Sequence, residues 1–116
     1  MGIVQRTGCR SRNRRMHNNI RDRNFLNLAY QYDCYLRIDG ICEGTTGEPC
    51  HANWSDYGKG GAMKAHDIFT APGCRSCHRE LDQGKRFDKE EKRRIWEKAW
   101  RAYLVDLWRD RKIGVL

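Results

Sequence analysis

The sequence lacks any hydrophobic run of the ~18 residues that a membrane-spanning helix requires. It also lacks the pattern of a secretory signal, because the short apolar stretch Met1–Val4 is followed by arginines. These two absences argue against a membrane or secreted protein, and we expect a protein of the reducing cytoplasm. Six cysteines in that compartment favour metal binding, with disulfide pairing as the alternative.

Apolar residues are also scarce, since only 39% of the 116 residues are hydrophobic while 33% are charged. We expect one domain with a thin core, and small domains of this kind usually need a metal or disulfide to hold them together. The formal net charge is +8. Such a charge favours a polyanionic partner, with nucleic acid as the first choice, although it could serve solubility alone.

Arginine dominates residues 1–23, where Asp22 is the only acidic residue. We expect this segment to be a flexible basic arm, and residues 24–116 to form a single domain. The DNA-binding candidates of the arm are Arg12, Arg14 and Arg15. The alternative is a solvated tail with no partner.

The first half of the domain contains a helix signal followed by a turn signal. Apolar residues in 24–33 recur at spacings of three and four, which predicts a short helix. In the segment CYLRIDGIC, residues 34–42, the pair Asp39-Gly40 predicts a β-hairpin with a two-residue turn. The turn-rich residues 43–49 predict a loop.

The second half contains one strand signal and two helix signals. Residues 68–70 favour a strand that ends at Pro72-Gly73, and residues 74–83 a tight turn followed by a short helix. A long amphipathic helix is expected from Asp88 to near Lys112, with Asp88 and Glu91 as a capping pair. Its expected core stripe comprises Trp96, Ala99, Trp100, Tyr103, Leu104, Leu107 and Trp108.

Two pairs of cysteines have the arrangement of a structural zinc site. One pair is separated by two residues, and the other would lie on opposite arms of the predicted hairpin. Four thiolates complete a tetrahedral site that contributes directly to folding. The predicted ligands are Cys34, Cys42, Cys74 and Cys77, which leaves Cys9 and Cys50 unassigned.

A second group of residues could carry catalysis. His78 follows Cys77 directly, and His78 and Asp82 are four residues apart on one helical face, as expected for two ligands of one divalent cation. His51 lies before a glycine-rich loop and could act as a general base on water. A purely structural role for these residues is the alternative.

Three motifs in residues 23–82 resemble those of the prophage YbcO-like nucleases, a branch of the HNH endonucleases. They are CYLRIDGIC, CHANWSDYGKGGAMKAHD and CRSCHRELD, and they span just over half of the chain. The resemblance implies an α+β fold of the zinc-stabilised ββα-metal (HNH-like) type, in which a hairpin, a loop and a helix surround one metal ion. Flanking helices and the long C-terminal helix would complete it.

The resemblance also implies roles for individual residues. His51 matches the first histidine of the HNH pattern, the general base, and His78 matches the last, a metal ligand. Asp82 stands where many HNH enzymes have another ligand. The middle asparagine has no clear equivalent; Asp67 lies in that region and would either bind the metal or orient His51. Asn53 is an alternative orienting residue.

The implied function is metal-dependent hydrolysis of DNA phosphodiester bonds in phage or prophage DNA processing or recombination, in the cytoplasm of a bacterial host. The cofactors would be structural Zn²⁺ and a catalytic Mg²⁺ or other divalent cation, with Lys59 and Lys64 on backbone phosphates. One alternative is a non-catalytic zinc-knuckle DNA-binding module with a degenerate HNH site. Another is an adaptor that docks through its tryptophan-rich helix; a homodimer is left open.

Overall fold

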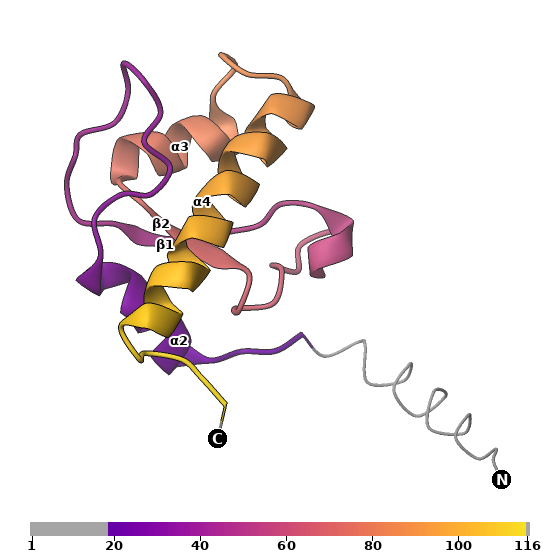
Figure 1. Ribbon diagram of the computed structural model, residues 1–116. Coiled ribbons are helices and arrows are strands. Elements are labelled where there is room, and N and C mark those ends of the chain that lie inside the picture. The colour runs from indigo at the N-terminus through magenta and orange to yellow at the C-terminus, as the bar shows by residue number, and fades with distance from the viewer. Residues whose placement is uncertain (1–18, 116) are drawn as a thin grey trace, which may run out of the picture.

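Two short antiparallel strands form the centre of the fold in the computed structural model, which describes residues 19–115 (Figure 1). They are β1 (Glu48–His51) and β2 (Thr70–Gly73). The two prolines of the sequence, Pro49 and Pro72, lie directly opposite each other. Proline has no N–H to donate, so this pair is tolerated only at a position that exchanges no hydrogen bonds. Strand β2 ends at Pro72-Gly73 as predicted, but it begins at Thr70 and not at Ile68.

The other strand occupies a segment that the sequence predicted to be a loop. The first two residues of β1, Glu48 and Pro49, fall in the turn-rich region 43–49. Their strand conformation comes from pairing with β2, a contact between segments far apart in the chain, and local propensity gives no sign of it. Between the strands, residues 52–69 form a long loop that includes the short 3₁₀ turn η2 (Ser55–Tyr57).

Helix α2 (Arg23–Leu28) continues into the 3₁₀ turn η1 (Ala29–Gln31), which confirms a short helical region near 24–33. The Asp22 carboxylate caps α2 by accepting a hydrogen bond from the Phe25 N–H at 3.1 Å. Residues 19–22 are bonded to the loop between the strands, so residues 19–23 belong to the fold and not to the expected flexible arm.

Residues 34–42 turn at Asp39-Gly40 as predicted, and Gly40 adopts the left-handed conformation that this turn requires (φ +80°). The flanking segments are not strands, however, so the predicted β-hairpin is absent from this described region. The reason lies in the backbone donors. The N–H groups of Arg37 and Ile38 point at cysteine sulfurs instead of a partner strand.

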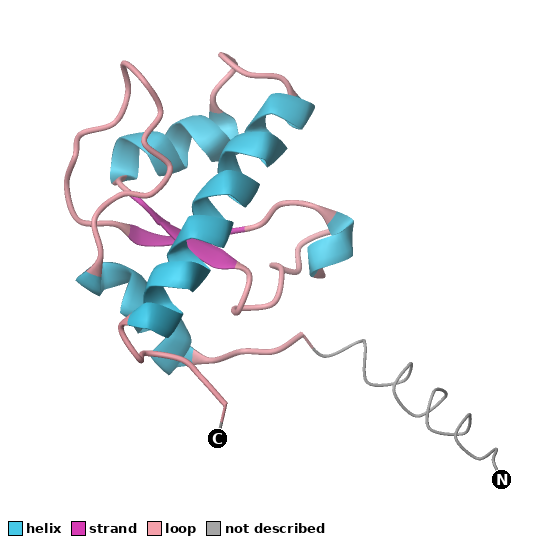
Figure 2. Cartoon of the chain, viewed as in Figure 1, coloured by secondary structure: helices cyan, strands magenta, loops and turns pink. Residues whose placement is uncertain are grey.

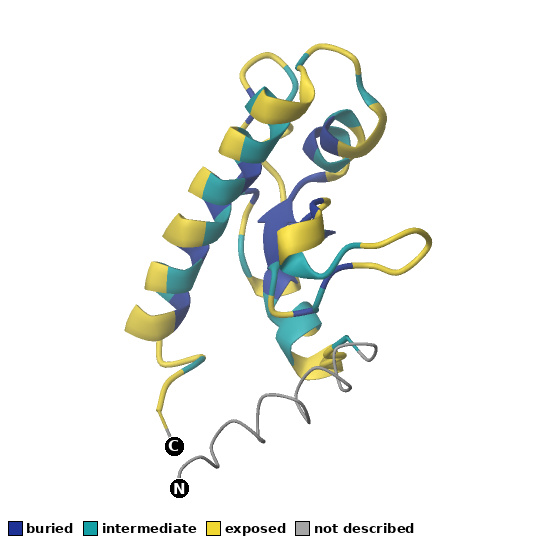
Figure 3. Ribbon diagram, turned by 90° about the vertical axis from the view of Figure 1, so that its right-hand side faces the viewer, coloured by how far each residue is buried: buried dark blue, intermediate teal, exposed yellow. Residues whose placement is uncertain are grey.

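The last two helices confirm the predicted pattern (Figure 2). Helix α3 (Arg75–Gln83) begins directly after Cys74, and α4 (Lys89–Arg109) begins with a capping box formed by Asp88 and Glu91. Helix α4 crosses the sheet and turns one face toward it (Figure 3). That face carries the buried residues Trp96, Ala99, Tyr103 and Leu107.

The predicted core stripe of α4 was too long by one tryptophan. Trp108 is 56% exposed although Leu107 before it is fully buried, because Trp108 lies off the buried face of the helix. The core itself joins α4 to the sheet, α3 and the 34–42 turn. Within residues 19–115, the structure contains no helix both long and apolar enough to cross a membrane.

Candidate functional site

Four cysteine side chains from two distant segments meet at the start of α3. Their sulfur atoms all lie within 4.8 Å of one another, close to the spacing of about 3.8 Å that sulfur ligands of one tetrahedral zinc ion would have. The 34–42 turn supplies one pair, and the start of α3 supplies the other. We call this group the cysteine cluster: Cys34, Cys42, Cys74 and Cys77.

Backbone N–H groups point at every sulfur of the cysteine cluster. Arg37 donates to Cys34 and Ile38 to Cys77, both at 3.4 Å. Glu43 donates to Cys74 at 3.4 Å, and Gly44 to Cys42 at 3.3 Å. Arg37 reaches this position with a φ of +43°, which is uncommon outside glycine. Donors aimed at sulfur stabilise thiolates, so the chemistry of the cluster fits a bound metal such as zinc.

All five cysteines in residues 19–115 are free thiols, and the fifth, Cys50, lies buried in β1 and does not belong to the cluster. Burial raises the pKa of the Cys50 thiol, so this residue behaves as an apolar core side chain. The predicted DNA-binding residues Arg12, Arg14 and Arg15 lie outside the described residues, and so does Cys9.

A cleft of about 550 Å³ opens beside β1, between the loop 52–69 and α3. Most of the predicted catalytic and phosphate-binding residues line it. Its walls are formed by Leu26, Pro49, His51, Ala52, Asn53, Lys59, Lys64, His78, Asp82 and Gln83.

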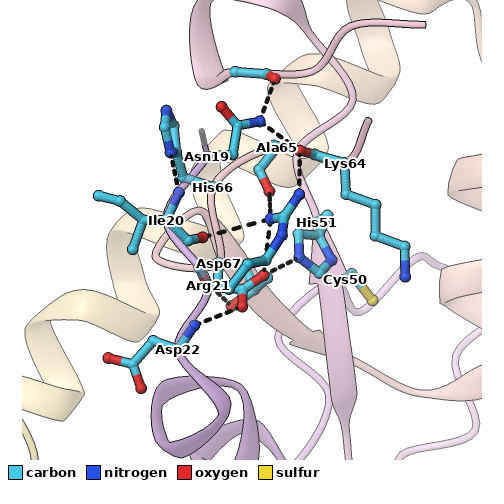
Figure 4. Close-up of polar contacts among 12 residues, drawn as sticks. Asn19, Ile20, Arg21, Asp22, Cys50, His51, Lys64, Ala65, His66 and Asp67 are labelled. Carbon is cyan, nitrogen blue, oxygen red and sulfur yellow. Dashed lines mark hydrogen bonds and ion pairs between the residues drawn. The ribbon is translucent and has the colours of Figure 1, made fainter. Parts of the chain in front are cut away.

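His51 lies at the end of β1 and is fixed by one carboxylate (Figure 4). Its Nε2 is 2.8 Å from Oδ1 of Asp67, and only 17% of its side chain is exposed. Nε2–H is the donor if the ring is neutral, because the Asp67 oxygen can only accept. Within residues 19–115 no partner is bonded to Nδ1, which is free to take a proton. Asn53 lines the same cleft, but Asp67 is the residue that holds His51.

Asp67 is almost fully buried, with 5% of its side chain exposed, yet both of its oxygens are paired. Oδ2 accepts a hydrogen bond from the Asp22 N–H at 2.7 Å, and Oδ1 also accepts from Arg21 at 3.2 Å. Burial favours the neutral acid, but the hydrogen bonds from His51 and the Asp22 N–H, with the charge of Arg21, hold the pKa of Asp67 below its usual value. The site therefore contains an ionised carboxylate next to His51.

His78 lies on α3, one residue after the cysteine cluster, and both of its ring nitrogens contact carboxylates. Nδ1 is 2.8 Å from Oε2 of Glu48, and Nε2 is 3.2 Å from Oδ2 of Asp82. The bond to Asp82, together with that to Glu48, raises the pKa of His78 despite its partial burial. The predicted pairing of His78 with Asp82 on one helical face is thus present.

Asp67 belongs to a different hydrogen-bonded group from His78 and Asp82. Asp67 is bonded to His51 and to the segment before α2, while His78 is bonded to Glu48 and Asp82. Among the residues that the structure describes, only the cysteine cluster brings three or more metal-ligating side chains within 4.8 Å of one another. A cation beside His78 would therefore take few protein ligands.

Sequence reasoning missed Glu48 and Arg21. Glu48 lies in a segment that resembled a loop, and Arg21 was one of many arginines in the expected arm. His66, which lies in the loop 52–69, accepts a hydrogen bond from the Ile20 N–H through Nδ1 at 2.9 Å and packs on Phe69. Its role in the described structure is to hold the loop.

No family model and no curated protein matches the sequence. The fold is similar to a solved structure described as that of "a putative bacteriophage protein from Escherichia coli str. K-12 substr. MG1655". The two chains are 22% identical with a TM-score of 0.56, and the match covers 74% of this chain and 98% of the other. At this identity the likeness shows a shared fold alone.

Proposed function

We propose that the protein is a metal-dependent endonuclease that hydrolyses DNA phosphodiester bonds. The proposal rests on the residues that line the cleft. A histidine oriented by a buried carboxylate lines it together with a histidine–aspartate pair on α3. The order β1, long loop, β2, α3 is also the order of a ββα-metal (HNH-like) nuclease, as the resemblance of the sequence motifs implies.

His51 is the proposed general base. With Nε2–H donated to Asp67, Nδ1 keeps a lone pair, and the negative charge of Asp67 would stabilise the imidazolium that forms when Nδ1 takes a proton. The water that loses this proton attacks phosphorus in line, and the bond from phosphorus to the 3′-oxygen breaks. Asp67 thus takes the orienting role, because both of its oxygens already have donors.

His78 and Asp82 are the proposed ligands of the catalytic cation. A bound Mg²⁺ or similar ion would supply positive charge for the developing negative charge on the phosphate and the leaving oxygen. Oε2 of Glu48 lies at hydrogen-bond distance from the other ring nitrogen of His78, Nδ1. A carboxylate in this position commonly orients a metal-binding histidine. Two protein ligands suit Mg²⁺, which usually keeps several waters and one or two carboxylates.

Lys59 and Lys64 give the cleft its affinity for DNA in this proposal. Both line the cleft, and Lys64 is exposed. Lysine contacts to phosphates set affinity and register without sequence preference. A net charge of +8 agrees with a polyanionic partner. The likeness to the E. coli protein described as a bacteriophage protein supports a phage or prophage setting.

The alternative function is a non-catalytic DNA-binding module held together by zinc. The small number of ligands around His78 favours it, since only the cysteine cluster forms a group of three or more ligands in the described part of the chain. The two functions differ in one outcome. A nuclease nicks DNA when a divalent cation is added, whereas a binding module only retains it.

The test is incubation of the full chain with supercoiled plasmid and Mg²⁺, Mn²⁺ or EDTA. We expect nicked circles with either cation. We expect none with EDTA, because EDTA chelates the divalent cation that the site beside His78 would bind. A His51→Ala protein purified in the same way is the control for contaminating nuclease. Wild-type protein that binds plasmid but never nicks it with any cation would establish the non-catalytic alternative. A panel of duplex, nicked, flap and four-way junction DNA then defines the substrate.

A further inference from the structure

We propose that Arg21 is a positioning residue for His51, acting through Asp67, and that the segment Asn19–Asp22 is a built-in part of the nuclease site. The inference rests on the proposed function, because it gives a role to the groups behind the general base. Figure 4 shows this segment lying along the loop that carries Asp67, with the Arg21 side chain directed into it.

The Arg21 guanidinium makes three hydrogen bonds to one short stretch of the loop. One nitrogen donates to Oδ1 of Asp67 at 3.2 Å and to the Ala65 carbonyl at 2.7 Å. The other nitrogen donates to the Lys64 carbonyl at 3.0 Å. The guanidinium spreads these donors over two nitrogens of one rigid plane, whereas the three donors of a lysine ammonium leave from a single nitrogen. The contacts therefore require arginine and not merely a positive charge.

Arg21 and His51 share the same oxygen of Asp67, and this links the arginine to the proposed base. A buried carboxylate stays ionised only if it is paired and hydrogen-bonded, and Asp67 is 5% exposed. Within residues 19–115, Arg21 is the one lysine or arginine paired with Asp67. Loss of Arg21 would leave Oδ1 of Asp67 with His51 as its hydrogen-bond donor, while the Asp22 N–H still holds Oδ2. The carboxylate would be held less firmly on the side that orients the imidazole.

Asn19 and Ile20 hold the loop by contacts that do not involve Asp67 side-chain atoms, whereas the Asp22 N–H donates to Oδ2 of Asp67 at 2.7 Å. The Asn19 amide donates to the carbonyls of Gly58 and Lys64, each at 2.8 Å. The backbone of Ile20 is bonded to His66 and to the Asp67 N–H. Asn19 and Arg21 both donate to the Lys64 carbonyl, but Arg21 also donates to the Asp67 carboxylate and Asn19 does not. This difference provides a matched pair of variants.

The kinetic test compares Arg21→Ala with Asn19→Ala in the full chain, using a cleaved duplex substrate. We expect Arg21→Ala to lower kcat about 10–100-fold, the range for groups that orient a catalytic residue, and to raise KM no more than Asn19→Ala does, since both side chains contact the Lys64 carbonyl. Asn19→Ala should instead raise KM, because it loosens the lysine-bearing loop. Added guanidinium should restore part of the Arg21→Ala rate, while sodium chloride at equal ionic strength should not. A merely structural arginine would give no such rescue.

A second measurement does not depend on activity. Nitrogen-15 spectra of the histidine rings in zinc-loaded protein report which nitrogen of His51 carries the proton and whether it is hydrogen-bonded. We expect the Nε2 signal of His51 to change in Arg21→Ala and to keep its wild-type position in Asn19→Ala. An unchanged His51 signal, or an Arg21→Ala protein with wild-type kcat, overturns the inference and leaves the nuclease proposal standing. Wild-type protein that never cleaves DNA overturns the nuclease proposal, and the spectra still decide the link between Arg21 and His51.

Discussion

The cysteine cluster and the cleft are joined by α3 but differ in how they are enclosed. Cys74 and Cys77 at the start of the helix point into a closed group whose four sulfurs each accept a backbone N–H. One residue later, His78 faces an open cleft with two carboxylates around it. The cluster would supply all four ligands of a bound metal, whereas the cleft leaves room for water and for the proposed substrate.

The proposed function requires this difference, because structural and catalytic metal sites differ in the same way. A structural zinc site is saturated by four protein ligands, while a catalytic site keeps positions free. Cys77 of the cluster and His78 of the cleft are neighbours on α3, a helix of nine residues, so the cluster can fix the position of His78 in the cleft. We therefore expect damage to the cluster to affect folding, and damage in the cleft to affect chemistry with the fold intact.

The largest effect is expected from Cys77→Ser. Structural zinc contributes about 10–16 kcal/mol to the folding of small zinc domains, more than the whole stability of most of them. The variant should lose zinc and unfold. Elemental analysis and circular dichroism measure both, and wild type should contain about one zinc per chain. Cys50→Ala is the control, since Cys50 is buried but outside the cluster, and it should keep its zinc. A folded, zinc-free Cys77→Ser protein would contradict a structural role.

The next largest effect is expected from His51→Ala, which should reduce the cleavage rate about 10²–10⁴-fold, the range for a positioned general base. Zinc content, thermal unfolding and DNA affinity should stay near wild type, because the base acts on water and holds little of the duplex. Single-turnover cleavage at saturating DNA is the measurement.

Asn53→Ala provides the comparison within the cleft. Asn53 lines the cleft without holding His51, whose partner is Asp67, so this variant should cleave within a few-fold of wild type. A large loss in Asn53→Ala together with near-normal cleavage by His51→Ala would place the base elsewhere in the cleft.

The sequence predicted the parts of both sites that lie close together in the chain. Nine residues of one helical region contain Cys74, Cys77, His78 and Asp82. Their spacing alone predicted which side chains would lie on the same face. The cysteine cluster was also predicted correctly as a group, although the turn around Cys34 is held by N–H···S contacts and not by strand pairing.

The sequence could not predict the partners of the two histidines. Glu48 reaches His78 across 30 positions, and Arg21 reaches Asp67 across 46. Neither contact leaves a periodic pattern, since each depends on how the strands and the loop pack. Asp67 was left with two roles for the same reason, because spacing cannot show that both of its oxygens already have donors.

A smaller effect is expected from Glu48→Gln, which keeps an acceptor for His78 but removes its charge. Loss of such a partner typically weakens metal affinity 10–100-fold. The concentration of Mg²⁺ or Mn²⁺ needed for half-maximal cleavage should rise by that factor, while the rate at saturating cation changes little. The tightly bound zinc should not change, which separates the open site from the closed one. If the cation requirement is that of wild type, Glu48 does not support a metal-binding His78.

The smallest effect is expected from Lys64→Ala, because a single exposed lysine contributes one phosphate contact among several. Each contact to duplex DNA adds about 0.9 to the slope of log affinity against log salt, since it releases counterions. The variant should bind DNA a few-fold more weakly at low salt, with a slope lower by about one. Lys112→Ala removes the same charge beyond the end of α4 and outside the cleft, so its slope should match wild type. Equal slopes for the two variants would mean that net charge, and not the cleft, sets DNA affinity.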